Sequence, residues 1–179
     1  MIGNNIAMYG MTLGLIVGLI IAIVIIKYAN KNNKFKTEYD ERQKIERGKG
    51  YTIAFYTLVA YESLMSLLSI GDIELPLHDF AIHFTGIVIA ITVHCVYCIW
   101  KEVYWGLNND RKKYMMVFAL CIVLNALPVL GNALAGNLFD NGKIGLAMLN
   151  IMVLIMLVIV VITMLIKGMV NKNTGTDEE

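Results

Sequence analysis

A single carboxylate, Glu62, stands in the middle of an otherwise apolar segment, where an ionisable group is rare. It lies eleven residues beyond Tyr51, which is about 16 Å along a helix. Asn125 reaches a similar depth in a later apolar segment, and His94 lies roughly 9–16 Å from the corresponding end of another. We therefore expect Glu62, His94 and Asn125 to form one polar layer near the middle of a membrane.

Two roles are open for this layer. An acidic side chain at the centre of a span costs about 2.5–3.5 kcal/mol, so it is expected to face the bundle interior and find a partner. The layer would then serve as a relay for protons or cations in a small oligomeric transporter or channel. Alternatively, a neutral Glu62 joins helices through hydrogen bonds worth about 0.6 kcal/mol each. The absence of a second acidic residue in any span, and of a clear internal repeat, disfavours transport.

Three cysteines lie in apolar segments. Cys95 and Cys98 have the Cys-x-x-Cys spacing of thiol oxidoreductases and of half a zinc site, and on a helix they share a face. Cys121 is the third thiol. The alternative interpretation is that all three are small buried hydrophobic residues. Cys95 and Cys98 are therefore candidates for thiol redox chemistry, and we expect no metal site and no cofactor.

The hydrophilic parts contain no pattern typical of an enzyme. They carry no nucleotide-binding loop, no nucleophile elbow, no His-Glu-x-x-His and no paired glycosidase carboxylates, and they are too short to fold into a catalytic domain. We therefore expect no enzymatic activity and no catalytic residues. The net charge of +1 gives no indication of a nucleic-acid partner, and none is expected.

The composition indicates a lipid environment. Of the 179 residues 58% are hydrophobic and 16% are charged, against about 45–50% and about 25% in soluble domains. A span needs about 20 apolar helical residues, and five segments approach this length. The sequence predicts an all-α membrane bundle, residues 1–170, and a flexible acidic tail, residues 171–179. The expected spans are residues 6–28, 51–70, 80–100, 114–133 and 144–166.

The distribution of lysine and arginine predicts the orientation, because basic loops stay in the cytoplasm. With the N-terminus outside and the C-terminus inside, 14 of the 15 basic residues face the cytoplasm and only Lys143 lies outside. We expect a multi-pass protein of the cell membrane, with lipid bilayer around it.

The cytoplasmic loop, residues 29–50, is rich in charge. Thr37 and Asp40 resemble a capping box, and Gly48 and Gly50 lower helix propensity before the next span, so we expect a short helix hinged onto that span. Its charged residues form either a docking surface for a protein partner or anionic lipid headgroups, or a solvated face that only fixes the topology. The candidate interaction residues are Asp40, Glu41, Arg42, Arg47 and Lys49.

Three glycines recur every four residues in the first expected span, at Gly10, Gly14 and Gly18. Small residues at this spacing let two membrane helices approach closely. The stripe would pack against another helix of the same chain or against a second copy in a homo-oligomer.

Two strings carry a resemblance to other proteins. The first is Tyr39-Asp40-Glu41-Arg42-Gln43 with Arg47-Gly48-Lys49, which leads into a helix containing Phe55 and Tyr56; the second runs from Cys98 to Tyr104 and continues to Leu107-Asn108. Both resemble a group of uncharacterised multi-spanning membrane proteins from Gram-positive anaerobes. The group has no assigned activity, so the resemblance implies an architecture and no catalytic residues.

The function expected from the sequence is that of a non-enzymatic accessory, sensor or regulatory subunit that acts through a membrane or cytoplasmic protein partner. Its cytoplasmic face would be the segment 37–49 and the loop 100–113. The alternatives are the small transporter or channel described above, and a membrane thiol redox protein.

Overall fold

The computed structural model describes residues 17, 20–21, 23–24, 37–109, 111–136, 138–140, 143–144 and 147–173. The chain divides into two units, Met1–Glu38 and Tyr39–Glu179. In the first unit the described residues 17, 20–21 and 23–24 are helical. Gly10, Gly14, Gly18 and most of the first expected span lie outside the described residues.

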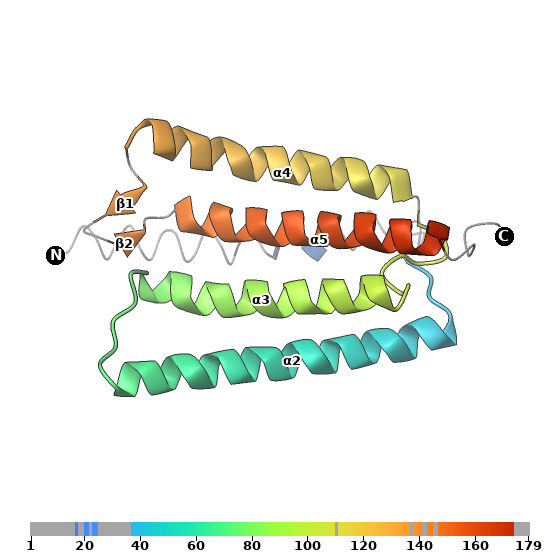
Figure 1. Ribbon diagram of the computed structural model, residues 1–179, viewed down its shortest axis with the longest axis horizontal. Coiled ribbons are helices and arrows are strands. Elements are labelled where there is room, and N and C mark those ends of the chain that lie inside the picture. Colours follow the sequence, from blue (N-terminus) through green and yellow to red (C-terminus); the bar gives the residue numbers. More distant parts are fainter. Residues whose placement is uncertain are drawn as a thin grey trace. The chain divides into compact units, whose positions relative to one another are not determined.

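The second unit is a row of helices (Figure 1). Helices α2 and α3 pack together, α3 packs on α5, and α5 packs on α4. The ribbon shows α3 and α5 running in the same direction, with α2 and α4 antiparallel to them. A two-residue antiparallel pair connects α4 to α5. The elements are α2 (Glu41–Ile70), α3 (Asp79–Trp100), α4 (Arg111–Leu134), β1 (Phe139–Asp140), β2 (Lys143–Ile144) and α5 (Ala147–Asn173).

Four helices of the described chain are long and apolar enough to cross a membrane. They coincide with the second to fifth expected spans, and their length and composition support a helical membrane protein. The buried core lies between the central helices α3 and α5, with Val88, Cys98 and Ile99 on one and Leu157 and Val160 on the other. Helices α2 and α4 form the edges of the row, and their apolar faces are uncovered within the described chain.

Helix α2 differs from the expectation at its start. It is continuous from Glu41 to Ile70, so the hinge expected at Gly48 and Gly50 is wrong. The capping box is also shifted, because Asp40 accepts from the backbone of Gln43 and the Gln43 side chain accepts from the backbone N–H of Asp40. Gly50 is buried against α3, and tertiary packing overrides its low helix propensity.

Helices α2 and α3 end in the same way. After α3, the N–H groups of Glu102 and Val103 bond to the carbonyls of Ile99 and Cys98, with Glu102 at φ 60°. This is a Schellman motif, which usually places glycine at the left-handed position. The equivalent residue after α2 is Asp72, at φ 52°. Helix α5 extends to Asn173, so the first three residues of the expected flexible tail are helical.

Candidate functional site

Two contacts define how α2 lies against α3. The rings of Tyr51 and His94 are stacked with centroids 4.2 Å apart. One carboxylate oxygen of Glu62 lies 2.9 Å from Nδ1 of His83. Glu62 follows Tyr51 by eleven residues and His94 follows His83 by eleven, as an antiparallel pair of helices requires.

The partner of Glu62 is therefore His83, and His94 lies about 16 Å away along the helix pair. The expected common depth of Glu62 and His94 is not observed. Asn125, on the edge helix α4, donates from Nδ2 to the carbonyl of Cys121 in its own helix, at 2.8 Å. The side chains of His83 and Glu62 are 66% and 36% exposed within the described chain, so this pair lies on the surface of the row.

Glycines allow the close approach of the two helices. A Cβ on Gly86 of α3 would lie 2.5 Å from the Tyr61 ring and 3.0 Å from a carboxylate oxygen of Glu62. A Cβ on Gly50 of α2 would lie 3.0 Å from Nδ1 of His94. Tyr61 also donates from its hydroxyl to the carbonyl of Ile82 at 2.9 Å. The register of α2 on α3 thus depends on one glycine from each helix.

The cysteines have different surroundings. Cys98 is fully buried, and its Sγ lies 3.6 Å from Nε2 of His94. Cys95 is half-buried and hydrogen-bonded to the Tyr104 hydroxyl, and Cys121 lies on α4. Burial of this site raises the pKa of Tyr104. Burial makes Cys98 poorly accessible to an external thiol, and the redox role of Cys95 and Cys98 remains a prediction.

The charged start of α2 is bound to the loop that follows α3. Arg47 donates to the carbonyls of Val103 and Tyr104, at 3.1 and 3.4 Å. Gln43 donates from Nε2 to the carbonyl of Trp105 at 3.3 Å, and Arg42 donates to that of Lys101 at 3.2 Å. Residues 101–105 leave these carbonyls without helical partners, since α3 ends at Trp100. The side chains of α2 supply the missing donors.

The other candidate residues of this segment have more local contacts. The Arg47 guanidinium lies over the Tyr39 ring, 4.3 Å from its centroid. Lys49 forms an ion pair with Glu46 at 2.6 Å, and the other carboxylate oxygen of Glu46 accepts from the Tyr97 hydroxyl at 2.7 Å. Glu41 is exposed in the first turn of α2, beside the capping residue Asp40.

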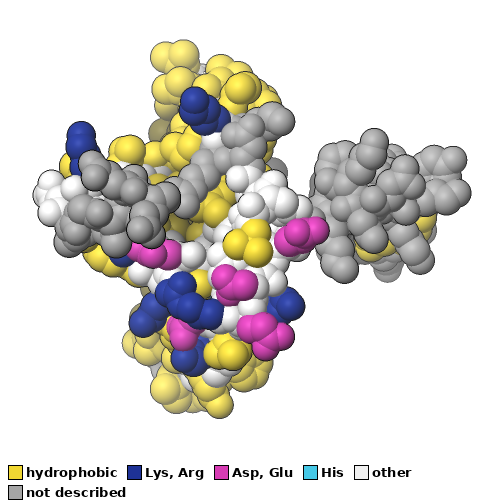
Figure 2. Space-filling model, turned by 90° about the vertical axis from the view of Figure 1, so that its right-hand side faces the viewer, with side chains coloured by type: hydrophobic (Ala, Val, Ile, Leu, Met, Phe, Trp, Pro, Cys, Tyr) yellow, Lys and Arg dark blue, Asp and Glu magenta, His cyan; other side chains and the backbone are white. Residues whose placement is uncertain are grey.

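The same loop is bound to the end of α5. Glu102 forms an ion pair with Lys167 at 2.9 Å and accepts from Nδ2 of Asn171 at 3.0 Å. These two contacts hold the pKa of the Glu102 carboxyl below its ordinary value of 4.5. Lys167 also lies 5.8 Å from the centroid of the Trp100 ring. We call residues 40–49, 101–106 and 167–171 together the charged platform. Figure 2 shows acidic and basic side chains gathered at the end of the molecule that carries it.

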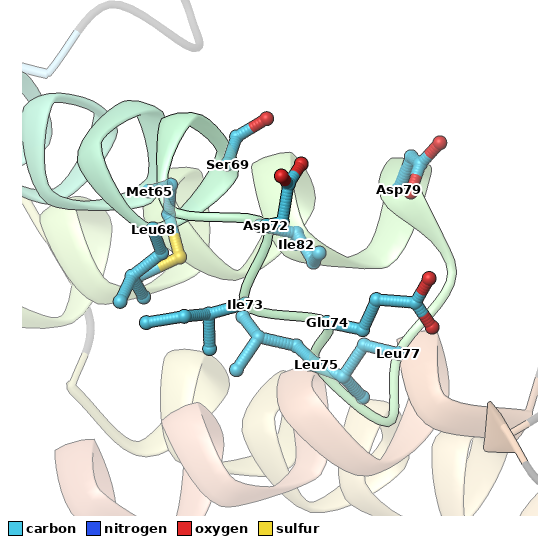
Figure 3. Close-up of a pocket in the computed structure, with 10 residues that line it drawn as sticks. All are labelled: Met65, Leu68, Ser69, Asp72, Ile73, Glu74, Leu75, Leu77, Asp79 and Ile82. Atoms are coloured by element: carbon cyan, nitrogen blue, oxygen red, sulfur yellow. The ribbon is translucent and has the colours of Figure 1, made fainter.

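The opposite end of the α2–α3 pair contains two adjoining hollows, of about 270 and 540 Å³. Met65, Ser69, Asp79 and Ile82 line both. In Figure 3 the Asp72 and Asp79 carboxylates and the Ser69 hydroxyl lie along one side of the smaller hollow, whereas apolar side chains, Met65 among them, occupy the other. His83, the partner of Glu62, lines the larger hollow.

Sequence reasoning did not identify several residues of these sites. His83 was not predicted as the partner of Glu62, although its separation from His94 equals that between Tyr51 and Glu62. Gln43 was considered only as part of a motif. Its position three residues after Asp40 is the signal for the observed capping box.

No protein-family model, curated protein or solved structure matches this chain. In the described part of the chain, no three carboxylate, imidazole or thiol groups converge as metal ligands.

Proposed function

We propose that this protein is a non-enzymatic sensor or regulatory subunit of the cell membrane that acts on a protein partner through the charged platform. The observation that carries the proposal is the set of hydrogen bonds from Arg47 and Gln43 to the loop after α3. These bonds join α2 to α3, and the Glu102–Lys167 pair joins the same loop to α5. These contacts hold the start of α2, the end of α3 and the end of α5 together, and the partner would bind the surface that they form.

The topology that goes with this role has five spans, with the N-terminus outside and the platform in the cytoplasm. The concentration of basic residues on the platform side supports it. The resemblance of the segments 39–49 and 98–108 to multi-spanning bacterial membrane proteins supports the same arrangement. Because Arg42 and Arg47 are engaged within the chain, the partner would contact the outward face of α2, where Ile45 is 60% exposed.

Site-specific photo-crosslinking in the native host tests this role. A photoreactive residue at Ile45 is expected to give a protein adduct of discrete mass, and Arg47→Met is expected to reduce its yield by loosening the platform. The same residue at Leu124, an exposed position on α4, is the matched control and should give lipid adducts. Equal adduct patterns at the two positions, from protein shown to be folded, would contradict the proposal.

A second candidate, proton or cation transport, is favoured by the Glu62–His83 pair, because a carboxylate and an imidazole in contact at membrane depth can exchange a proton. Flux into proteoliposomes separates the two functions. Transport requires a flux that Glu62→Gln abolishes and that Glu41→Gln, at the platform end of the same helix, leaves unchanged. The sensor role requires no flux through folded wild-type protein.

A further inference from the structure

The larger hollow at the ends of α2 and α3 is half open to its surroundings and is comparable in volume with small-molecule sites. Its volume of about 540 Å³ falls within the range of about 300–1,000 Å³ that is usual for ligand pockets. Met65, Ile70 and Ile82 provide apolar wall, and Ser66, Ser69, Asp79 and His83 provide polar groups. A site of this kind takes a ligand with an apolar body and one polar head.

The charge around the hollow determines the sign of that head. From residue 50 to residue 100 the sequence contains no lysine or arginine, and it contains four carboxylates, Glu62, Asp72, Glu74 and Asp79. Asp79 lines both hollows, and Asp72 and Glu74 line the smaller one. A concave surface of one charge sign beside apolar walls concentrates ligands of the opposite sign. The head is therefore cationic.

The geometry favours an ammonium group over a metal ion. Metal sites of oxygen ligands need several carboxylate or carbonyl oxygens around one point, and no such convergence of three side-chain ligands occurs in the described chain. The larger hollow instead has one carboxylate, that of Asp79, together with the apolar side chains of Met65, Ile70 and Ile82. An alkylated or aromatic amine matches both at once.

We propose that the hollow bounded by Met65, Asp79 and His83 binds an organic ammonium ion with an apolar body. The ammonium group lies against Asp79, and the apolar body lies on Met65, Ile70 and Ile82. This ligand is the input of the sensor role proposed above, on which the inference rests for its physiological purpose. Binding is measurable whether or not a partner exists.

Benzyltrimethylammonium is the probe, titrated calorimetrically into the full chain in nanodiscs. Saturable binding is expected, weakened at least five-fold by Asp79→Asn and weakened by added salt. Asp177→Asn, which removes a carboxylate four residues after the end of α5, is the matched control and should leave the affinity unchanged. Ser69→Phe, at the shared wall of the two hollows, is expected to block binding by filling the space, with thermal unfolding confirming that each variant folds.

The lipid composition of the nanodisc separates the two sources of such a ligand. Weaker probe binding in phosphatidylethanolamine than in an uncharged galactolipid would assign the ammonium to a lipid headgroup, and equal binding would assign it to a dissolved amine. Both results support the site. The absence of saturable binding to folded wild type, or equal affinities in Asp79→Asn and Asp177→Asn, would overturn it and leave the crosslinking test of the sensor role unaffected.

Discussion

Glu62 on α2 and His83 on α3 lie in contact at 2.9 Å, about three helical turns from the stacked rings of Tyr51 and His94. The two contacts are about 16 Å apart along the helices, so they belong to different depths of a membrane. The carboxylate of Glu62 therefore has His83 as its partner, near the end of α3 that borders the two hollows.

The first prediction concerns the energetic coupling of Glu62 and His83. In a double-mutant cycle of Glu62→Gln and His83→Gln, we expect a coupling free energy of about 0.5–1.5 kcal/mol, because the two side chains share one interaction. Unfolding in mixed micelles measures it. The matched cycle of Glu62→Gln with His94→Gln should be additive within about 0.5 kcal/mol. Stronger coupling to His94 than to His83 would show that the register is wrong.

The sequence predicted the four long helices because the hydrophobicity of a span is a local property, visible in about twenty consecutive residues without knowledge of their neighbours in the fold. It did not predict the partner of Glu62, because depths were counted from an assumed edge at Tyr51. The helix in fact begins ten residues earlier, at Glu41. Helix register depends on side-chain packing at single positions, here Gly50 and Gly86, and hydropathy carries no signal for it.

The candidate interaction residues show a similar division. The sequence indicates their charge and their helical spacing, and the helix at 41–49 was expected. Their contacts could not be predicted from the sequence, because Arg47 and Gln43 donate to carbonyls more than fifty residues away along the chain. Those carbonyls can accept side-chain hydrogen bonds only because the helix ends and the chain turns at Glu102. This residue has a positive φ, a position at which glycine would have indicated the turn in the sequence.

The second prediction concerns the glycine of α3. Gly86→Ala is expected to lower the free energy of unfolding by about 1–3 kcal/mol, because the new methyl group meets the Tyr61 ring. Gly48→Ala, on the opposing helix with open space around it, should raise it by about 0.5–1 kcal/mol. Thermal unfolding of the two variants compares them. A stabilising Gly86→Ala would show that α2 and α3 pack less closely than observed.

The third prediction concerns the charged platform. Arg47→Met is expected to lower the free energy of unfolding by about 1.5–3 kcal/mol, because two carbonyls lose a charged donor while the apolar stem is kept. It should also speed proteolysis of the loop 101–110. Lys44→Met, an exposed change on the same helix, is the control and should stay within about 0.5 kcal/mol. Similar effects of both substitutions would argue against the hydrogen bonds to the loop.

The fourth prediction concerns acid stability. The ion pair with Lys167 and the hydrogen bond from Asn171 lower the pKa of Glu102 in the folded protein below its ordinary value of 4.5. The carboxylate therefore stabilises the fold at pH values above the unfolded pKa, and this contribution disappears as pH falls through the lower folded pKa. Wild type should unfold at a higher temperature than Glu102→Gln at pH 7, and the difference should shrink as the pH is lowered below 4.5. A difference that grew on acidification would contradict the sign of the shift.

The last prediction concerns the thiols. Cys98 is fully buried, whereas Cys95 and Cys121 are half-buried, so maleimide should label Cys98 more slowly than either. Single-cysteine variants in detergent, followed by mass spectrometry, measure the three rates, and partial unfolding should equalise them. If Cys98 reacts as fast as Cys95 in the folded protein, the helix pair opens at this depth. Both thiols of the Cys95–Cys98 pair would then be accessible to an external thiol or oxidant. That result would favour the redox interpretation, because a thiol enzyme needs reactive, accessible cysteines.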